Sequence, residues 1–119
     1  MITGIGTDII EISRLARAIE NSRFLSRYFT EAENEYFLLK NNNPQTIAAS
    51  FAAKEAFSKA LGTGFRGFGL RDVEVLRDKL GKPYINVYNN AKIFTDGGTI
   101  HLSLSHSHKY ATAFVVIEK

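Results

Sequence analysis

The sequence predicts an α+β domain in which an N-terminal strand and a helical half precede a set of antiparallel strands. Three patterns along the chain support this class. Apolar residues alternate with others at the start, recur at helical spacing through the middle, and return to short alternating runs toward the end. Short turns between consecutive strands favour antiparallel pairing. Because the chain has 119 residues, we expect a single domain over residues 1–119.

Residues 2–9 are the first predicted strand, because their side chains alternate in character. The pattern becomes helical from Glu11, and a second short helix is expected over Asn21–Phe29. Glycine weakens a strand, so its presence commonly marks the close approach of a ligand or another backbone. One predicted strand face carries Ile5, Thr7 and Ile9, and the other carries Gly4, Gly6 and Asp8.

Capping signals predict the next two helices. Thr30 with Glu33 three residues later is the capping-box pattern, and it opens a helix that runs to about Lys40. A helix over 44–61 begins with Pro44, which suits the first helical turn, and ends at Gly62. The 44–61 segment is rich in alanine and apolar nearly all round, so we expect it at the centre of the fold.

The C-terminal half is predicted to be mostly strands. A glycine-rich loop covers residues 62–69, and a short helix is expected near 89–95. The first pair of strands spans 72–77 and 83–88, with a turn between them. The closing hairpin spans 100–105 and 110–117.

Composition excludes several classes of function. The chain has no cysteine, which rules out disulfides, thiolate zinc sites and cysteine nucleophiles. No apolar run reaches the length of a membrane span, and the N-terminus lacks the pattern of a signal peptide, so we expect a cytoplasmic protein without a membrane partner. A net charge of +3 and a pI near 9.3 favour an anionic partner.

The candidate catalytic residues are Asp8, Glu55 and Lys59. Glu55 and Lys59 are four residues apart and share one helix face, which by itself is typical of a surface ion pair. The helix is otherwise almost wholly apolar, however, and a buried charge needs a partner or an ion. Asp8 could cap the following helix. Two carboxylates with a nearby lysine also suit Mg²⁺ and a phosphate.

Three histidines, His101, His106 and His108, lie in the closing hairpin. Without cysteine or a neighbouring carboxylate, a closed zinc site is not expected, and hydrogen-bonded histidines are the simpler interpretation, above all for His101. A serine hydrolase is not indicated, because no nucleophile elbow is present. The 62–69 loop lacks the ending of a P-loop, and Gly62 is equally well explained as a helix C-cap.

Four arginines gather in the first helical stretch, where they form either a solvated face or a docking surface for an acidic partner. A basic nucleic-acid-binding module, with aromatic residues for stacking, is an alternative of a different class. Its signal is weak, because no RNA-binding signature appears, and we expect no nucleic-acid partner. The arginines are Arg14, Arg17, Arg23 and Arg27.

Four segments, in order, resemble one family along essentially the whole chain. They are Gly4–Arg14, Phe51–Lys59, Gly81–Tyr84 and Ser103–Ser107. The family is the holo-[acyl-carrier-protein] synthase type of 4'-phosphopantetheinyl transferase, and the resemblance implies its α+β fold and a homotrimer. A related transferase that acts on polyketide or peptide synthetase carriers is the nearest alternative, but such members resemble a tandem duplication of this unit.

The resemblance also implies roles for individual residues. Asp8 and Glu55 would hold Mg²⁺, and Lys59 would contact the diphosphate of coenzyme A. The carrier serine would attack the phosphorus that bears the pantetheine arm and release adenosine 3',5'-bisphosphate, a step in fatty acid biosynthesis. Glu55, Asp8 or a metal-bound water could accept the serine proton.

Further residues would bind coenzyme A and the carrier protein. His106 and Ser107 would bind coenzyme A across a subunit boundary, and Gly62 would line the same cofactor site. Arg14 would meet acidic residues of acyl carrier protein, with the other three arginines on the same docking surface. The chain departs from the family at Ser50, where an arginine is common, and Arg66 is a candidate to compensate.

Overall fold

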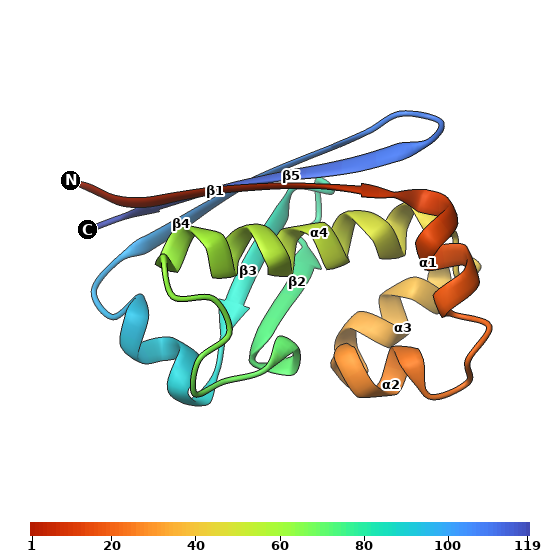
Figure 1. The fold of residues 1–119 in the computed structure, drawn as a ribbon, viewed down its shortest axis with the longest axis horizontal. Helices are drawn as coiled ribbons and strands as arrows, with labels where there is room; N and C mark the ends of the chain where they lie inside the picture. Colours follow the sequence, from red (N-terminus) through yellow and green to blue (C-terminus); the bar gives the residue numbers. More distant parts are fainter.

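The computed structural model describes all 119 residues of the chain. It confirms the α+β class: three long strands form a sheet, a long helix packs beneath it, and the helices Phe24–Tyr28 and Glu31–Leu39 lie on the far side of that helix (Figure 1). The elements in chain order are β1 (Ile2–Glu11), α1 (Ile12–Ala18), α2 (Phe24–Tyr28), α3 (Glu31–Leu39), α4 (Pro44–Leu61), the 3₁₀ turn η1 (Leu70–Asp72), β2 (Val73–Arg77), β3 (Pro83–Val87), the 3₁₀ helix η2 (Asn89–Phe94), β4 (Thr99–His106) and β5 (Tyr110–Glu118).

The strands form two antiparallel sheets. The larger has the order β1-β5-β4, so the C-terminal strand β5 lies between the N-terminal strand and β4. The smaller is the β2–β3 hairpin. Both chain ends therefore lie at the same end of the larger sheet (Figure 1).

Two predicted elements shift at one end by two residues or more, and a third differs in helix type. β1 continues two residues beyond the predicted strand, because its ladder with β5 extends to the pair Glu11 and Tyr110. The second helix starts only at Phe24, because the side chain of Asn21 accepts a hydrogen bond from the Arg23 amide at 2.9 Å and shapes a turn there. The segment 89–94 is a 3₁₀ helix.

The capping predictions for the helices are confirmed. The Thr30 hydroxyl accepts from the Glu33 amide at 3.2 Å, and the Glu33 carboxylate accepts from the Thr30 amide at 2.9 Å. At α4, Pro44 occupies the first turn, and Gly62 ends the helix in the left-handed region with φ 78°. α4 buries most of its side chains and is central, as its apolar surface predicts.

The strand glycines allow β1 to touch the backbone of α4. A Cβ atom at Gly4 would overlap the carbonyl oxygen of Ala60, and one at Gly6 would overlap that of Ala56. The close approach that the sequence indicates is therefore made by another backbone. Because the contacting residues on both elements are small, the backbones of β1 and α4 approach closely, and side chains beside the contact can reach one another.

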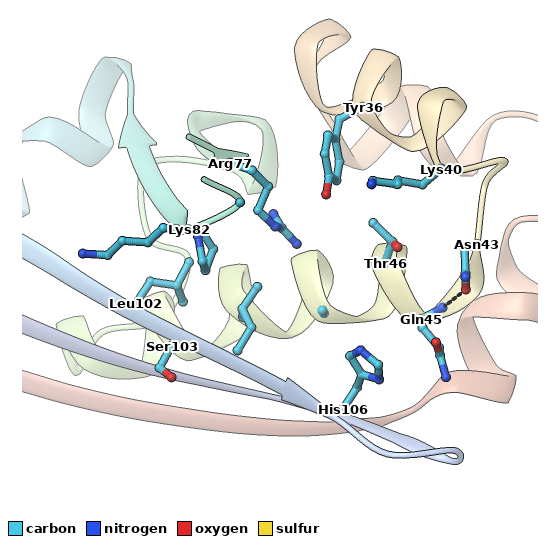
Figure 2. A pocket seen from close by; sticks show the side chains of 14 residues that line it. Tyr36, Lys40, Asn43, Gln45, Thr46, Arg77, Lys82, Leu102, Ser103 and His106 are labelled. Carbon is cyan, nitrogen blue, oxygen red and sulfur yellow. Dashed lines mark hydrogen bonds between the residues drawn. The ribbon is translucent and has the colours of Figure 1, made fainter. Parts of the chain in front are cut away.

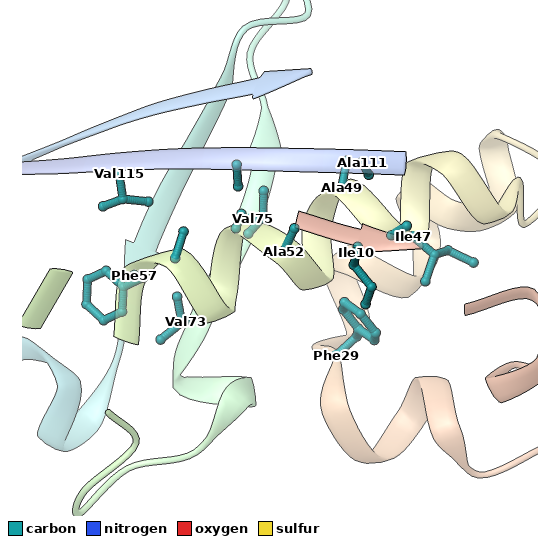
Figure 3. Close-up of a cluster of buried hydrophobic side chains, with 14 of the residues drawn as sticks. Ile10, Phe29, Ile47, Ala49, Ala52, Phe57, Val73, Val75, Ala111 and Val115 are labelled. Carbon is teal, nitrogen blue, oxygen red and sulfur yellow. The ribbon is translucent and has the colours of Figure 1, made fainter. Parts of the chain in front are cut away.

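The buried apolar residues form one continuous cluster around α4 (Figure 3). Phe57, Val73 and Val115 pack at one end of the helix, and Phe29 and Ile47 pack at the other. No helix combines the length and the apolar character that crossing a membrane requires.

A buried ion pair, which the sequence analysis did not assign, ties the helical half to α4. Lys54 and Glu33 are both fully buried, with Nζ and Oε1 2.7 Å apart. Lys54 also donates to the carbonyl oxygens of Tyr28 at 3.1 Å and Leu70 at 2.8 Å, and the second Glu33 oxygen accepts from the Val75 amide at 3.0 Å. One lysine on α4 thus joins α2, α3 and η1.

Candidate active site

The three candidate catalytic residues meet between β1 and α4. Asp8 is on the face of β1 that carries the glycines, so it points toward α4. Lys59 Nζ lies 3.1 Å from Asp8 Oδ1 and donates a further bond to the Thr7 carbonyl at 3.1 Å. The Asp8 side chain is 16% exposed and that of Lys59 is 56% exposed. Asp8 does not cap the first helix, because that helix begins only at Ile12.

Glu55 lies one turn before Lys59 on α4 and is half-buried. Burial raises the pKa of Glu55, the negative charge of Asp8 raises it further, and Lys59 opposes both effects. Two carboxylates thus interact electrostatically at a partly desolvated place, where a cation would stabilise both in the ionised form.

The donor set at this place fits a hard divalent cation. No cluster of three or more His, Cys, Asp or Glu side chains exists in the chain, so a closed all-protein metal site is not formed. Mg²⁺ typically uses one or two carboxylates and completes its coordination with water and substrate phosphates. Asp8 and Glu55 provide that pair of carboxylates, and Lys59 adds a positive charge.

A pocket of about 670 Å³ opens at the opposite edge of the sheet, between β4, α3 and the β2–β3 hairpin. Its charged side chains are all basic, and Figure 2 shows Lys40, Arg77, Lys82 and His106 among the residues that line it. A pocket of this character suits a phosphorylated ligand. It is lined by Tyr36, Lys40, Asn43, Gln45, Thr46, Ala49, Arg77, Gly81, Lys82, Pro83, Leu102, Ser103, Leu104 and His106.

His106 is the last residue of β4 and contributes to this pocket (Figure 2). Because β5 separates β4 from β1, His106 and Asp8 lie at opposite edges of the sheet in one chain. Ser107 has a role in the turn: its hydroxyl oxygen accepts from the Tyr110 amide at 3.2 Å. The structure therefore does not bring His106 or Ser107 to the carboxylates within a protomer.

The other predicted residues have simpler environments. Gly62 is the left-handed C-cap of α4, and Arg66 is exposed in the loop that follows. His101 forms a hydrogen-bonded pair with Glu118 at 3.0 Å, which confirms the simpler interpretation of that histidine. Arg14, Arg17, Arg23 and Arg27 are all exposed, and none forms an ion pair.

Sequence reasoning missed two groups. Lys54 directly precedes Glu55 on an almost wholly apolar helix. A lysine in that setting needs an acidic partner, and this was the available signal; the structure shows it fully buried against Glu33. Arg77 ends β2 and lines the basic pocket, but its position at the edge of a short strand gives no local sign of such a role.

Comparison with known proteins defines the class. The sequence profile of the 4'-phosphopantetheinyl transferase superfamily matches residues 4–115, and the chain belongs to this family. Within it, the chain is similar to holo-[acyl-carrier-protein] synthases. The chain is 57% identical to the holo-[acyl-carrier-protein] synthase of Clostridium botulinum (strain Alaska E43 / Type E3) over 121 residues, which cover 99% of this chain and 98% of the relative.

Solved structures of the same class share the fold. The holo-[acyl-carrier-protein] synthase of Neisseria meningitidis superposes with a TM-score of 0.91 at 36% identity, with 100% of both chains covered. That of Bacillus anthracis, solved in complex with CoA (3',5'-ADP), superposes with a TM-score of 0.84 at 38% identity, covering 100% of this chain and 98% of the other.

Proposed function

We propose that this protein transfers the 4'-phosphopantetheine group of coenzyme A to a serine of apo-acyl carrier protein, in fatty acid biosynthesis. The proposal rests on one observation: Asp8, Glu55 and Lys59 lie close enough to interact, in a chain that belongs to the transferase family. The protein acts in the cytoplasm as a single domain. The product released beside the charged carrier is adenosine 3',5'-bisphosphate.

Asp8 and Glu55 would hold Mg²⁺, which supplies neutralising charge to the coenzyme A diphosphate when it is bound. Lys59 stabilises negative charge on the leaving nucleotide, because its side chain is half-exposed and its ammonium group lies beside Asp8. Glu55, Asp8 or a metal-bound water is the candidate acceptor of the serine proton.

We place the complete site between two copies of the chain in a homotrimer. The carboxylates and the basic pocket lie at opposite edges of one sheet, so a ligand that uses both needs a neighbouring protomer. The outer face of the sheet supports such an assembly, because Ile5, Ile9 and Phe114 are 62%, 64% and 47% exposed there. Large exposed apolar side chains on one face commonly mark an interface. In this arrangement His106 and Ser107 approach the nucleotide from the neighbour, and Gly62 borders the site.

The carrier protein docks on the exposed arginines of α1 and α2. Arg14 and Arg17 follow directly from β1, the strand that carries Asp8. Arg14→Glu should raise the KM for acyl carrier protein several-fold, with little change in the KM for coenzyme A, because a rim charge acts mainly on its charged partner. The effect should shrink in high salt. Equal changes in both KM values would contradict the docking role.

The activity itself is tested by mass spectrometry of the carrier. Apo-acyl carrier protein incubated with coenzyme A, Mg²⁺ and this protein should gain one phosphopantetheine group, and EDTA should abolish the gain. Apo-carriers from polyketide and peptide synthetases, tested in the same assay, distinguish a dedicated enzyme from a broad one. If none of the carriers changes mass, the proposed function is wrong.

A further inference from the structure

The glycine-rich loop over residues 62–69 depends on other elements for its conformation. Gly64 and Gly67 have φ angles of 70° and 79°, so both lie in the left-handed region. A Cβ atom at either position would meet nothing within 4 Å, so close packing is not the reason for these glycines. Glycine loses more conformational freedom on folding than any other residue, and contacts from outside the loop must therefore hold this conformation.

The 3₁₀ helix η2 supplies hydrogen bonds that hold the loop. The side-chain amide of Asn90 donates to the carbonyl oxygen of Gly67 at 2.8 Å. The side-chain amide of Asn89 donates to one carboxylate oxygen of Asp72 at 2.7 Å. The other oxygen of Asp72 accepts from the Gly69 amide at 3.0 Å, so the end of the loop is tied to the same helix. Figure 1 shows the loop, in green, and η2, in light blue, side by side near the C-terminal end of α4.

Aromatic side chains strengthen the contact between the loop and η2. The ring centre of Phe68 in the loop lies 6.2 Å from that of Phe57 on α4 and 5.7 Å from that of Phe94 on η2. Phe65 packs against Phe68, with ring centres 5.4 Å apart. Aromatic pairs at these separations attract one another beyond the area that they bury. Because Phe57 is fully buried, the loop is anchored to the core as well as to η2.

The other end of the loop forms the C-terminal cap of α4. The Gly62 amide donates to the Lys59 carbonyl at 3.0 Å, and the Gly64 amide donates to the Ser58 carbonyl at 3.3 Å. These bonds satisfy carbonyl groups of the last helical turn, from which Lys59 reaches Asp8. The Lys59 side chain is 56% exposed, so few side chains surround it, and its place depends on the backbone of that turn.

We propose that Asn90 is a positioning residue: by holding the loop at Gly67 it fixes the cap of α4, and with it the position of Lys59. The inference rests on the proposed function, in which Lys59 stabilises charge on the leaving nucleotide. A charged group that is slightly displaced interacts less well with charge that develops in the transition state. Loss of the Asn90 amide should therefore affect turnover more than substrate binding.

Steady-state kinetics with coenzyme A and apo-acyl carrier protein test this role. Asn90→Ala should lower kcat by about 3- to 10-fold, the range of one hydrogen bond, and leave the KM for coenzyme A nearly unchanged. Asn90→Gln keeps the amide donor and should recover part of the loss. Lys92→Ala removes an exposed side chain from the same 3₁₀ helix and should change neither constant. A loss that appears mainly in KM, or no loss at all, would overturn the proposal.

A double-variant comparison tests whether Asn90 acts through Lys59. In a Lys59→Ala background, measured at high enzyme concentration, Asn90→Ala should cause no further loss of rate, because both changes remove the same interaction. Losses that multiply would show that Asn90 affects the reaction by another route, and the proposal would then be wrong.

Hydrogen exchange followed by NMR gives a readout that needs no turnover. Asn90→Ala should speed exchange of the Gly62 and Gly64 amides by about 3- to 10-fold, because the loop that holds them has lost one hydrogen bond. Lys92→Ala should leave both rates unchanged. Unchanged exchange in Asn90→Ala would overturn the proposal, whatever the activity. The exchange rates also decide whether Asn90 holds the cap of α4 if no carrier is modified and the proposed function fails.

Discussion

Glu55 is a residue at which function opposes stability. Because burial and Asp8 raise its pKa, the protonated form stabilises the fold below the ordinary pKa, and this contribution is lost as the pH rises through the raised value. At neutral pH the ionised side chain therefore opposes folding. We predict that Glu55→Gln abolishes most turnover and raises the melting temperature of the metal-free protein at neutral pH, with a smaller rise in acid.

The metal supplies the control for this prediction. Mg²⁺ should raise the melting temperature of the unmodified protein, because a ligand that binds only the folded state stabilises it, and should have little effect on Glu55→Gln. Thermal unfolding followed by circular dichroism measures both effects. A variant that melts lower at neutral pH, or responds fully to Mg²⁺, would contradict the assignment of Glu55.

Lys54 is the second residue whose environment leads to a prediction. Burial lowers its pKa while the paired Glu33 raises it, and the lysine donates three hydrogen bonds that favour the charged form. Lys54→Met should cost about 3–5 kcal/mol of unfolding free energy, because it leaves a buried carboxylate without its cation. Urea denaturation measures the loss.

Two further variants separate the ion pair from side-chain volume. Lys54→Met combined with Glu33→Gln should recover part of the loss, because no lone charge remains buried. Lys92→Met, at an exposed lysine of η2, should change stability little. A double variant less stable than Lys54→Met alone would show that the carboxylate does not need the lysine.

At the scale of elements, the contact between β1 and α4 determines where Asp8 lies relative to Glu55. Gly6→Ala should force the strand and helix apart, because the new Cβ atom would overlap the Ala56 carbonyl. We expect a loss of about 1–3 kcal/mol, typical of overpacking, together with weaker Mg²⁺ binding. Gly69→Ala is the matched control, since its Cβ would meet nothing within 4 Å. Equal stability of the two variants in urea would argue against a tight contact.

At the scale of the whole molecule, the separation of the carboxylates from His106 leads to a prediction about assembly. Glu55→Ala and His106→Ala should each be nearly inactive, and their co-expression should restore part of the activity. Mixed trimers then contain one interface at which both residues are intact. The assay is transfer to apo-acyl carrier protein by co-purified mixed oligomers, with separately purified variants combined without exchange as the control.

Light scattering completes this test. A trimer is the expected species at assay concentration. A fully active monomer would contradict both the trimer and the shared site. Trimers that fail to complement would leave the assembly in place but show that His106 and Glu55 act from the same protomer, or that one of them is not essential.

The sequence alone determined those features that depend on neighbours in the chain. The capping box at Thr30, the long helix ending at Gly62 and the two-faced first strand follow from local periodicity and caps, and the structure confirms them. Asp8 and Glu55 could be predicted as a pair because the motifs around them resemble one family, and their residue types suit a metal.

The tertiary structure alone decided the features that join distant segments. The order β1-β5-β4, which separates His106 from Asp8, depends on long-range pairing that no local pattern contains. The Lys54–Glu33 pair and the contact of Arg77 with the Tyr36 ring likewise arise only when α3, α4 and β2 pack together. A side chain's burial and its partners are properties of the packed molecule, so the cost of a buried charge, and the function it indicates, can be determined only there.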